Sequence, residues 1–228
     1  MHISGLQKLT LLDFPGKLAA TVFLGGCNFR CPFCHNASLV LSPSKCDNIS
    51  EERFFEFLNS RQGKLGGVCV TGGEPTLYPD LKNFIKKIKD MGFAVKLDTN
   101  GTNPDLLSSL IEEELVDYVA MDVKNSPGKY PITVGVNCDM EKIGRSISIL
   151  LDGKVDYEFR TTVVKELHKE DDFLAISEWI KGAKRYFLQT FEDSGDLIGQ
   201  GFSAYSREES EDIIRKILPN VPNAQIRS

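Results

Sequence analysis

The feature that most restricts the fold is an alternation, repeated about six times, of a short apolar run with a longer amphipathic stretch. The apolar runs are rich in Val, Phe, Tyr and Thr, which predicts buried strands over residues 19–25, 67–72, 93–99, 116–123, 155–164 and 184–191. The amphipathic stretches predict helices over residues 50–58, 79–91, 105–114, 140–151, 171–181 and 207–218. Alternation of this kind joins parallel strands by right-handed crossovers, so the sequence predicts an α/β fold. An open doubly wound sheet and a full or partial barrel both satisfy it.

Composition excludes several classes of protein. The chain has 228 residues, of which 41% are apolar, and its net charge is only 27 − 32 = −5, so it can bury a large core and is not disordered. Basic and acidic residues are interleaved, which argues against nucleic acid or an anionic membrane as a partner. No apolar run approaches the ~18 residues of a membrane-spanning helix, and the first residues do not resemble a secretory signal. We therefore expect a cytoplasmic protein.

Six cysteines indicate a metal or redox centre. Cys27, Cys31 and Cys34 lie within eight residues, whereas Cys46, Cys69 and Cys138 are isolated. A disulfide framework belongs to smaller secreted chains. Structural zinc takes four ligands, usually from two Cys pairs, and no second pair is present. Three thiolates on a four-iron cluster would leave one iron without a protein ligand, as a reactive metal centre requires. The cysteine spacing favours such a cluster over structural zinc.

Polar or small residues follow each predicted strand directly. In parallel sheets and barrels the carboxyl ends of the strands meet at one edge, where function gathers. The residues that should meet there include the three clustered cysteines, Gly72, Gly73, Glu74, Asp98, Thr99, Asn100, Asp122, Lys124, Arg160 and Gln189. We therefore expect a ligand site at this edge.

Two of these segments carry a resemblance to a known family. Cys-x3-Cys-x2-Cys after the first strand, with Phe33 before the last cysteine, and Gly-Gly-Glu-Pro after the second strand together resemble the radical S-adenosylmethionine enzymes over about residues 5–195. The resemblance implies a partial (β/α)6 TIM-type barrel forming one domain over residues 1–228. Its core would span about residues 15–195, followed by a C-terminal helix and tail over 199–228. It also implies one 4Fe-4S cluster, held by Cys27, Cys31 and Cys34, that binds S-adenosylmethionine and cleaves it reductively to methionine and a 5′-deoxyadenosyl radical.

The same resemblance implies roles at the methionine end of the cofactor. Gly72 and Gly73 would let the backbone approach it, because neither has a Cβ. Glu74 would accept from its amino group, and Lys124 would bind its carboxylate. The Asp-Thr-Asn-Gly segment at residues 98–101 and the Asp-x-Lys segment at 122–124 also resemble this family. The resemblance implies that Asp98, Thr99 and Asp122 hold a monovalent cation against that carboxylate, with Asn100 beside them.

Fewer residues are implied at the adenine end. The backbone of Phe33 would lie near the adenine. Apart from the resemblance, Arg160 lies at the end of the fifth predicted strand, where it could pair with a carboxylate of the ligand or form a structural ion pair. Near the sixth strand end, where formate-lyase activases have a histidine, this chain has Gln189, and Phe191 could lie against the adenine instead.

The segment Leu-Leu-Asp-Phe-Pro-Gly-Lys at residues 11–17 and the sequence Cys-Asn-Phe-Arg-Cys-Pro-Phe-Cys-His-Asn at 27–36 resemble the glycyl-radical-enzyme activases. They are most similar to the activating proteins of anaerobic ribonucleoside-triphosphate reductase. The resemblance implies hydrogen abstraction from a glycine Cα of that partner enzyme. Only about 32 residues, with one Cys, separate Cys34 from Gly67, so the second-cluster insert of other activases is missing. The electron would then come from an external donor such as flavodoxin or ferredoxin.

Two other functions remain open. Short 7-carboxy-7-deazaguanine synthases have the same barrel and act on a small molecule, but they lack the lead-in at residues 11–17. A non-catalytic iron–sulfur or zinc module needs only the three clustered cysteines and leaves the polar residues at the other strand ends unexplained.

Overall fold

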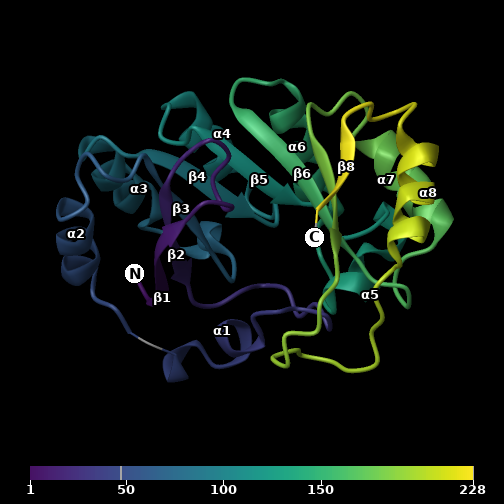
Figure 1. The fold of residues 1–228 in the computed structure, drawn as a ribbon, viewed down its shortest axis with the longest axis horizontal. Coiled ribbons are helices and arrows are strands. Elements are labelled where there is room, and N and C mark those ends of the chain that lie inside the picture. Colours follow the sequence, from purple (N-terminus) through teal and green to yellow (C-terminus); the bar gives the residue numbers. More distant parts are fainter. Residues whose placement is uncertain (47, 228) are drawn as a thin grey trace.

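The computed structural model describes residues 1–46 and 48–227, and its centre is one curved sheet of eight strands (Figure 1). The strands are β1 Ile3–Thr10, β2 Ala19–Leu24, β3 Gly67–Gly72, β4 Ala94–Thr99, β5 Tyr118–Asp122, β6 Asp156–Val163, β7 Tyr186–Thr190 and β8 Ala224–Arg227. They lie in sequence order across the sheet. Strands β2 to β8 are parallel, and only β1 is antiparallel to its neighbour.

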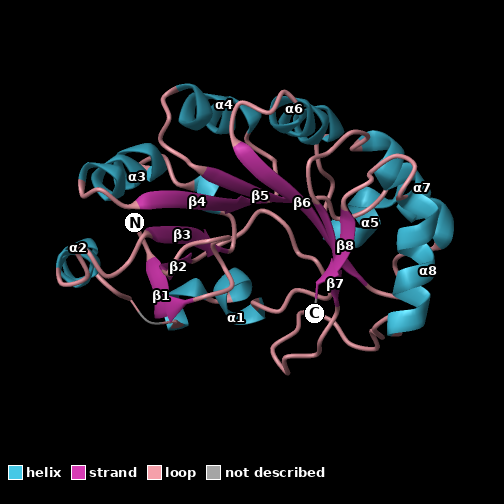
Figure 2. Ribbon diagram, turned by 45° about the horizontal axis from the view of Figure 1, so that its top comes forward, coloured by secondary structure: helices cyan, strands magenta, loops and turns pink. Residues whose placement is uncertain are grey.

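The longer helices cover the outer face of this sheet (Figure 2). The helices are α1 Ala37–Leu41, α2 Glu51–Asn59, α3 Leu81–Asp90, α4 Pro104–Glu112, α5 Tyr130–Val134, α6 Met140–Leu151, α7 Glu170–Trp179 and α8 Arg207–Ile217. All six predicted strands and all six predicted helices are confirmed, with small shifts at their ends. No pairing between β1 and β8 closes the sheet within the described residues, so the architecture is a partial barrel. Within the same residues, no helix is long and apolar enough to cross a membrane.

Two strands at the sheet edges were not predicted. β1 carries Gly5, Gln7 and Lys8 among its apolar residues, and β8 is four residues long with two polar side chains. Neither strand is a continuous apolar run. An edge strand has a neighbouring strand on only one side, so fewer of its side chains are buried. The parallel strands therefore number seven, one more than the six of the predicted barrel.

Alternation along the strands separates an apolar outer face from a polar interior. On β4, Val95 and Leu97 belong to the core under the helices, while Lys96 between them is buried in the interior. On β6, Glu158 is likewise buried, and it binds Arg227 of β8 at 2.6 Å. The interior of the barrel is therefore lined with paired charges.

The segment at residues 11–17 closes the amino end of the barrel. Phe14 is 2% exposed, and its ring lies 6.3 Å from that of Tyr118 at the start of β5. Its Cδ1 and Cε1 atoms also occupy the space where a Cβ on Gly67 would lie. Asp13 Oδ2 accepts a 2.5 Å hydrogen bond from Thr21. The segment thus lies at the end of the strands opposite their carboxyl edge.

Candidate active site

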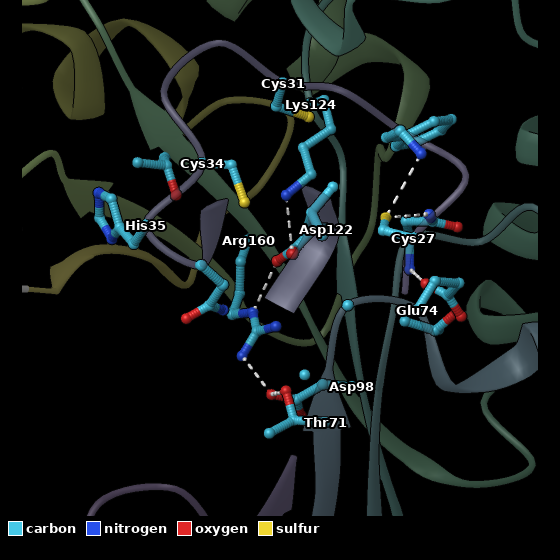
Figure 3. Close-up of a pocket in the computed structure, with 18 of the residues that line it drawn as sticks. Cys27, Cys31, Cys34, His35, Thr71, Glu74, Asp98, Asp122, Lys124 and Arg160 are labelled. Atoms are coloured by element: carbon cyan, nitrogen blue, oxygen red, sulfur yellow. Dashed lines mark hydrogen bonds and ion pairs between the residues drawn. The ribbon is translucent and has the colours of Figure 1, made fainter. Parts of the chain in front are cut away.

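One cavity of about 250 Å³ lies at the carboxyl ends of the strands. With the exception of Phe191, the residues that the sequence predicted for the site all line it: Cys27, Cys31, Phe33, Cys34, Gly72, Gly73, Glu74, Asp98, Thr99, Asn100, Asp122, Lys124, Arg160 and Gln189. Figure 3 labels residues of this cavity that come from the loop after β2, from strands β3 to β6 and from the segments directly after β3 and β5. The lining also includes Phe29, Val40, Thr71 and Thr162, to which the sequence assigned no role. Of these, Thr71 and Thr162 stand on predicted strands and could have been found from their place near the strand ends.

Three thiols face this cavity from the cysteine loop, residues 25–36, between β2 and α1. All six cysteines of the chain are free. Burial raises the pKa of Cys27 to about 11 and that of Cys31 to about 12, so both are neutral thiols until a cation compensates the thiolate charge. In the described part of the chain, no three His, Cys, Asp or Glu side chains converge on a single-ion site. Three thiols on one cavity are the donor set that a metal group held by thiolates would need.

Gly73 brings the end of β3 against the base of the cysteine loop. Its backbone N donates to Leu24 O at 2.8 Å, and Glu74 N donates to Gly26 O at 2.8 Å. A Cβ on Gly73 would lie 1.9 Å from Gly26 O, and one on Gly72, whose φ is +123°, would lie 2.4 Å from Leu24 N. Both glycines are therefore required by close backbone packing within the protein.

Glu74 connects the ends of β3 and β4. It is fully buried, and its Oε1 accepts from Thr76 N at 3.0 Å and from Thr99 Oγ1 at 2.8 Å. Its Oε2 accepts from Asn100 N at 2.6 Å. Burial raises its pKa, and these hydrogen bonds oppose that rise. Oε2 retains one lone pair for a further donor, so the expected contact with an amino group is compatible with this bonding.

Asn100 fixes the first part of the cysteine loop. Its Nδ2 donates to Asn28 Oδ1 at 2.8 Å and lies 3.9 Å from Cys27 Sγ. Asn28 in turn donates to Thr102 Oγ1 at 2.9 Å. These bonds hold Cys27 against the end of β4.

A chain of alternating charges forms the floor of the cavity (Figure 3). Arg160 of β6 lies between two carboxylates, with Nε 2.9 Å from Asp122 Oδ1 and Nη1 3.2 Å from Asp98 Oδ2. Lys124 Nζ lies 2.9 Å from Asp122 Oδ2, and Lys96 binds Asp98 Oδ1. Burial alone would raise the pKa of Asp122, but Arg160 and Lys124 outweigh it and hold that pKa well below its usual range. Both carboxylates are therefore ionised and paired.

The predicted monovalent cation does not fit these donors. Thr99 Oγ1 donates to Glu74 and accepts from Gly101 N at 3.1 Å, so its hydroxyl is engaged away from the two aspartates. Each oxygen of Asp98 and Asp122 already accepts from a cationic side chain. A monovalent cation needs several free oxygens around one point, and the three residues do not provide them.

The side of the cavity near β7 is lined by Gln189, as expected. Phe191, which was predicted as an adenine contact, is buried 5.5 Å from the ring of His35 and 6.4 Å from that of Phe202. It is not among the lining residues, because it begins the segment after β7 and packs under the cysteine loop. The ring of Phe33 is buried against His168, whose Nε2 lies 2.8 Å from Lys124 O.

The strap, residues 191–206, connects β7 to α8 and crosses beside α1 (Figure 1, yellow-green). Gly199 N donates to Pro32 O, between two of the cysteines, at 2.7 Å. Asp196 accepts from both the backbone N and the hydroxyl of Ser38, at 3.1 and 2.9 Å. The strap therefore holds the second half of the cysteine loop, as β3 and β4 hold the first half.

Known proteins match this sequence and this fold. The family model of the radical SAM superfamily matches residues 21–180. A Methanocaldococcus jannaschii protein named "Putative glycyl-radical enzyme activating enzyme" is 37% identical over 197 residues, which cover 83% of this chain and 80% of that protein. A 7-carboxy-7-deazaguanine synthase of Methanopyrus kandleri is 31% identical over 130 residues, about half of each chain. The solved structure of Streptococcus suis SuiB bound to the precursor peptide SuiA shares the fold, with a TM-score of 0.72 and 12% identity over 91% of this chain and 48% of that one. The chain thus belongs to the radical SAM superfamily, in its glycyl-radical-enzyme activase branch, and is an enzyme.

Proposed function

We propose that Cys27, Cys31 and Cys34 hold a 4Fe-4S cluster with one open iron, and that the enzyme activates an anaerobic ribonucleoside-triphosphate reductase. The observation that carries the proposal is that three thiols and the cations Lys124 and Arg160 line one cavity, whose described lining contains no fourth cysteine. An open coordination position is what a substrate-binding metal centre requires. The family implies this cluster and S-adenosylmethionine as its cofactors.

When bound, the cluster supplies an electron that splits S-adenosylmethionine into methionine and a 5′-deoxyadenosyl radical. The chain's own residues position the cofactor. Lys124 and Arg160 present cationic N–H donors to its carboxylate, and the free lone pair of Glu74 Oε2 accepts from its amino group. Gln189 and the backbone of Phe33 border the space left for the adenine.

Anaerobic reconstitution tests the cofactor chemistry. The reduced protein with S-adenosylmethionine should yield 5′-deoxyadenosine and methionine, and the yield should depend on the reductant and on Cys34. An intact, reducible cluster that yields neither product, even with the reductase present, would refute the proposed chemistry.

A second experiment tests the partner. Incubation with an anaerobic ribonucleotide reductase should produce a glycyl radical signal in electron paramagnetic resonance. We propose that flavodoxin or ferredoxin supplies the electron, because only one cysteine cluster is present in the sequence. Cofactor cleavage without a radical on the reductase would refute this partner and leave the activase assignment in place.

A second candidate is favoured by the match to a 7-carboxy-7-deazaguanine synthase over half of this chain. In that case the cavity would take a small heterocyclic substrate, and no protein partner would bind. Cofactor cleavage occurs in both cases and cannot separate them. Tight anaerobic binding of the reductase supports the activase, whereas conversion of a deazaguanine precursor without any partner supports the synthase.

A further inference from the structure

The guanidinium of Arg160 stands where a metal cation would have to bind between two carboxylates. Arg160 is on β6, and the carboxylates of Asp122 and Asp98 come from β5 and β4. The guanidinium binds one oxygen of each, at 2.9 and 3.2 Å, and its side chain is 12% exposed. It spans the two carboxylates as a bridging ion would, but it is covalently part of the chain.

Every oxygen of the two carboxylates already accepts from a cationic side chain, and each oxygen of Asp98 accepts from a second donor as well. Asp98 Oδ1 accepts from Lys96 and from the Cys69 thiol at 3.7 Å, and Asp98 Oδ2 accepts from Thr71 and Arg160, both at 3.2 Å. A metal ion could reach Asp98 only by displacing one of these donors, and at Asp122 it would lie against Arg160 and Lys124, which both repel it. Such a displacement would leave a buried cation unpaired, which is costly.

The charge balance also disfavours another cation. Two carboxylates, Asp98 and Asp122, face three cations, Lys96, Lys124 and Arg160, so the group already carries 3 − 2 = +1. An added monovalent ion would raise this to +2 in a largely buried site. An anion would lower it to zero, and within the described residues Arg160 Nη2 has no acceptor.

We propose that Arg160 replaces the monovalent cation of related activases, so that this enzyme binds the carboxylate of S-adenosylmethionine with a fixed guanidinium and needs no Na⁺ or K⁺. Arginine suits this role, because it stays charged and its planar fork donates to several carboxylates at once. The inference rests on the proposed binding of S-adenosylmethionine. It makes Arg160 a binding residue whose removal should create a cation requirement that the native enzyme lacks.

The test compares S-adenosylmethionine binding in tetramethylammonium, sodium and potassium chloride at equal ionic strength. Anaerobic calorimetry on the cluster-loaded protein gives the dissociation constant, and the change in the cluster's electron paramagnetic resonance signal on binding gives an independent readout. The native enzyme should bind with affinities within about threefold of one another, because screening is constant across the three salts.

Variants sharpen the test. Arg160→Gln should weaken binding about tenfold or more in tetramethylammonium chloride, since a charge-assisted contact is lost. Na⁺ or K⁺ should restore part of that affinity, because the two freed carboxylates can then hold an ion. Arg160→Lys keeps the charge and should bind without responding to either ion. Arg145→Gln, which removes an exposed ion pair between α6 and α4, is the matched control and should behave as the native enzyme.

Native affinity that rises about tenfold with Na⁺ or K⁺ would overturn the inference while leaving the proposed function standing. So would an Arg160→Gln protein that binds as the native enzyme does in tetramethylammonium chloride. Absence of binding by the native, cluster-loaded protein in every salt would instead overturn the proposed function, and the inference with it. If Arg160→Gln does not fold, the native salt series and Arg160→Lys decide the question.

Discussion

Replacing Gly73 with Ala should destabilise the protein by about 3 kcal/mol. The added Cβ would meet Gly26 O at 1.9 Å, and both atoms belong to packed backbone that cannot rotate away. The two hydrogen bonds at this junction, from Gly73 N and Glu74 N, would be lost or stretched at about 1 kcal/mol each. Residual strain from overpacking adds at least about 1 kcal/mol. The φ of Gly73 is not positive, so the cost comes from the close approach alone.

Guanidinium denaturation of the metal-free protein measures this change, and iron bound per chain after reconstitution shows whether the cysteine loop has moved. Gly144→Ala is the matched control. Gly144 lies within α6, and an added Cβ there would meet only Trp179 at 4.0 Å, so this variant should be more stable by about 0.5 to 1 kcal/mol. If Gly73→Ala is as stable as the native protein and binds as much iron, the close approach does not constrain this junction.

Cys34→Ala should abolish cofactor cleavage, whereas Cys138→Ala should retain it. Product analysis of the two reconstituted variants measures this, and loss of the cluster in Cys138→Ala would contradict the assignment of the three ligands. Phe14→Ala should lower the free energy of unfolding by about 3 to 5 kcal/mol, because a buried ring is deleted from the amino end of the barrel. A loss smaller than about 1 kcal/mol in guanidinium denaturation would rule that role out. Burial raises the pKa of Asp172, but Lys129 and two further donors lower it more, so the folded pKa lies below the unfolded one. The stabilisation is then present above about pH 4 and lost below it, and the stability difference between native protein and Asp172→Asn should shrink as pH falls through that range; a difference independent of pH would exclude it.

Most of the architecture could be predicted because each central strand is a continuous apolar run and each outer helix has one apolar face. The polar residues that follow those runs could be placed at one edge for the same reason. β8 could not be predicted, because its four residues alternate in polarity and are ordered by pairing with β7. The lead-in at residues 11–17 indicated the activase branch, but its position at the amino end of the barrel depends on Phe14 packing between strands distant in sequence.

The partners of individual side chains were harder to predict than their positions. Asp98, Thr99 and Asp122 all line the predicted cavity, yet the hydroxyl of Thr99 binds Glu74. Adjacent residues on a strand point to opposite faces, so the alternation already separated Thr99 from Asp98, but only the structure shows that the hydroxyl of Thr99 meets Glu74. Arg160 could equally have paired with a cofactor, and only its position between both carboxylates showed that it also binds the protein.

The double attachment of the cysteine loop has a consequence for oxygen damage. Glu74 N, just after β3, donates to Gly26 O of the loop, Gly199 N of the strap donates to Pro32 O, and neither bond involves metal. Small zinc domains, by contrast, unfold when their metal is removed. We therefore expect a protein bleached by air to keep its fold and, after thiol reduction, to accept iron and sulfide again without passing through an unfolded state. Such an enzyme could be repaired after each exposure to oxygen instead of being made anew.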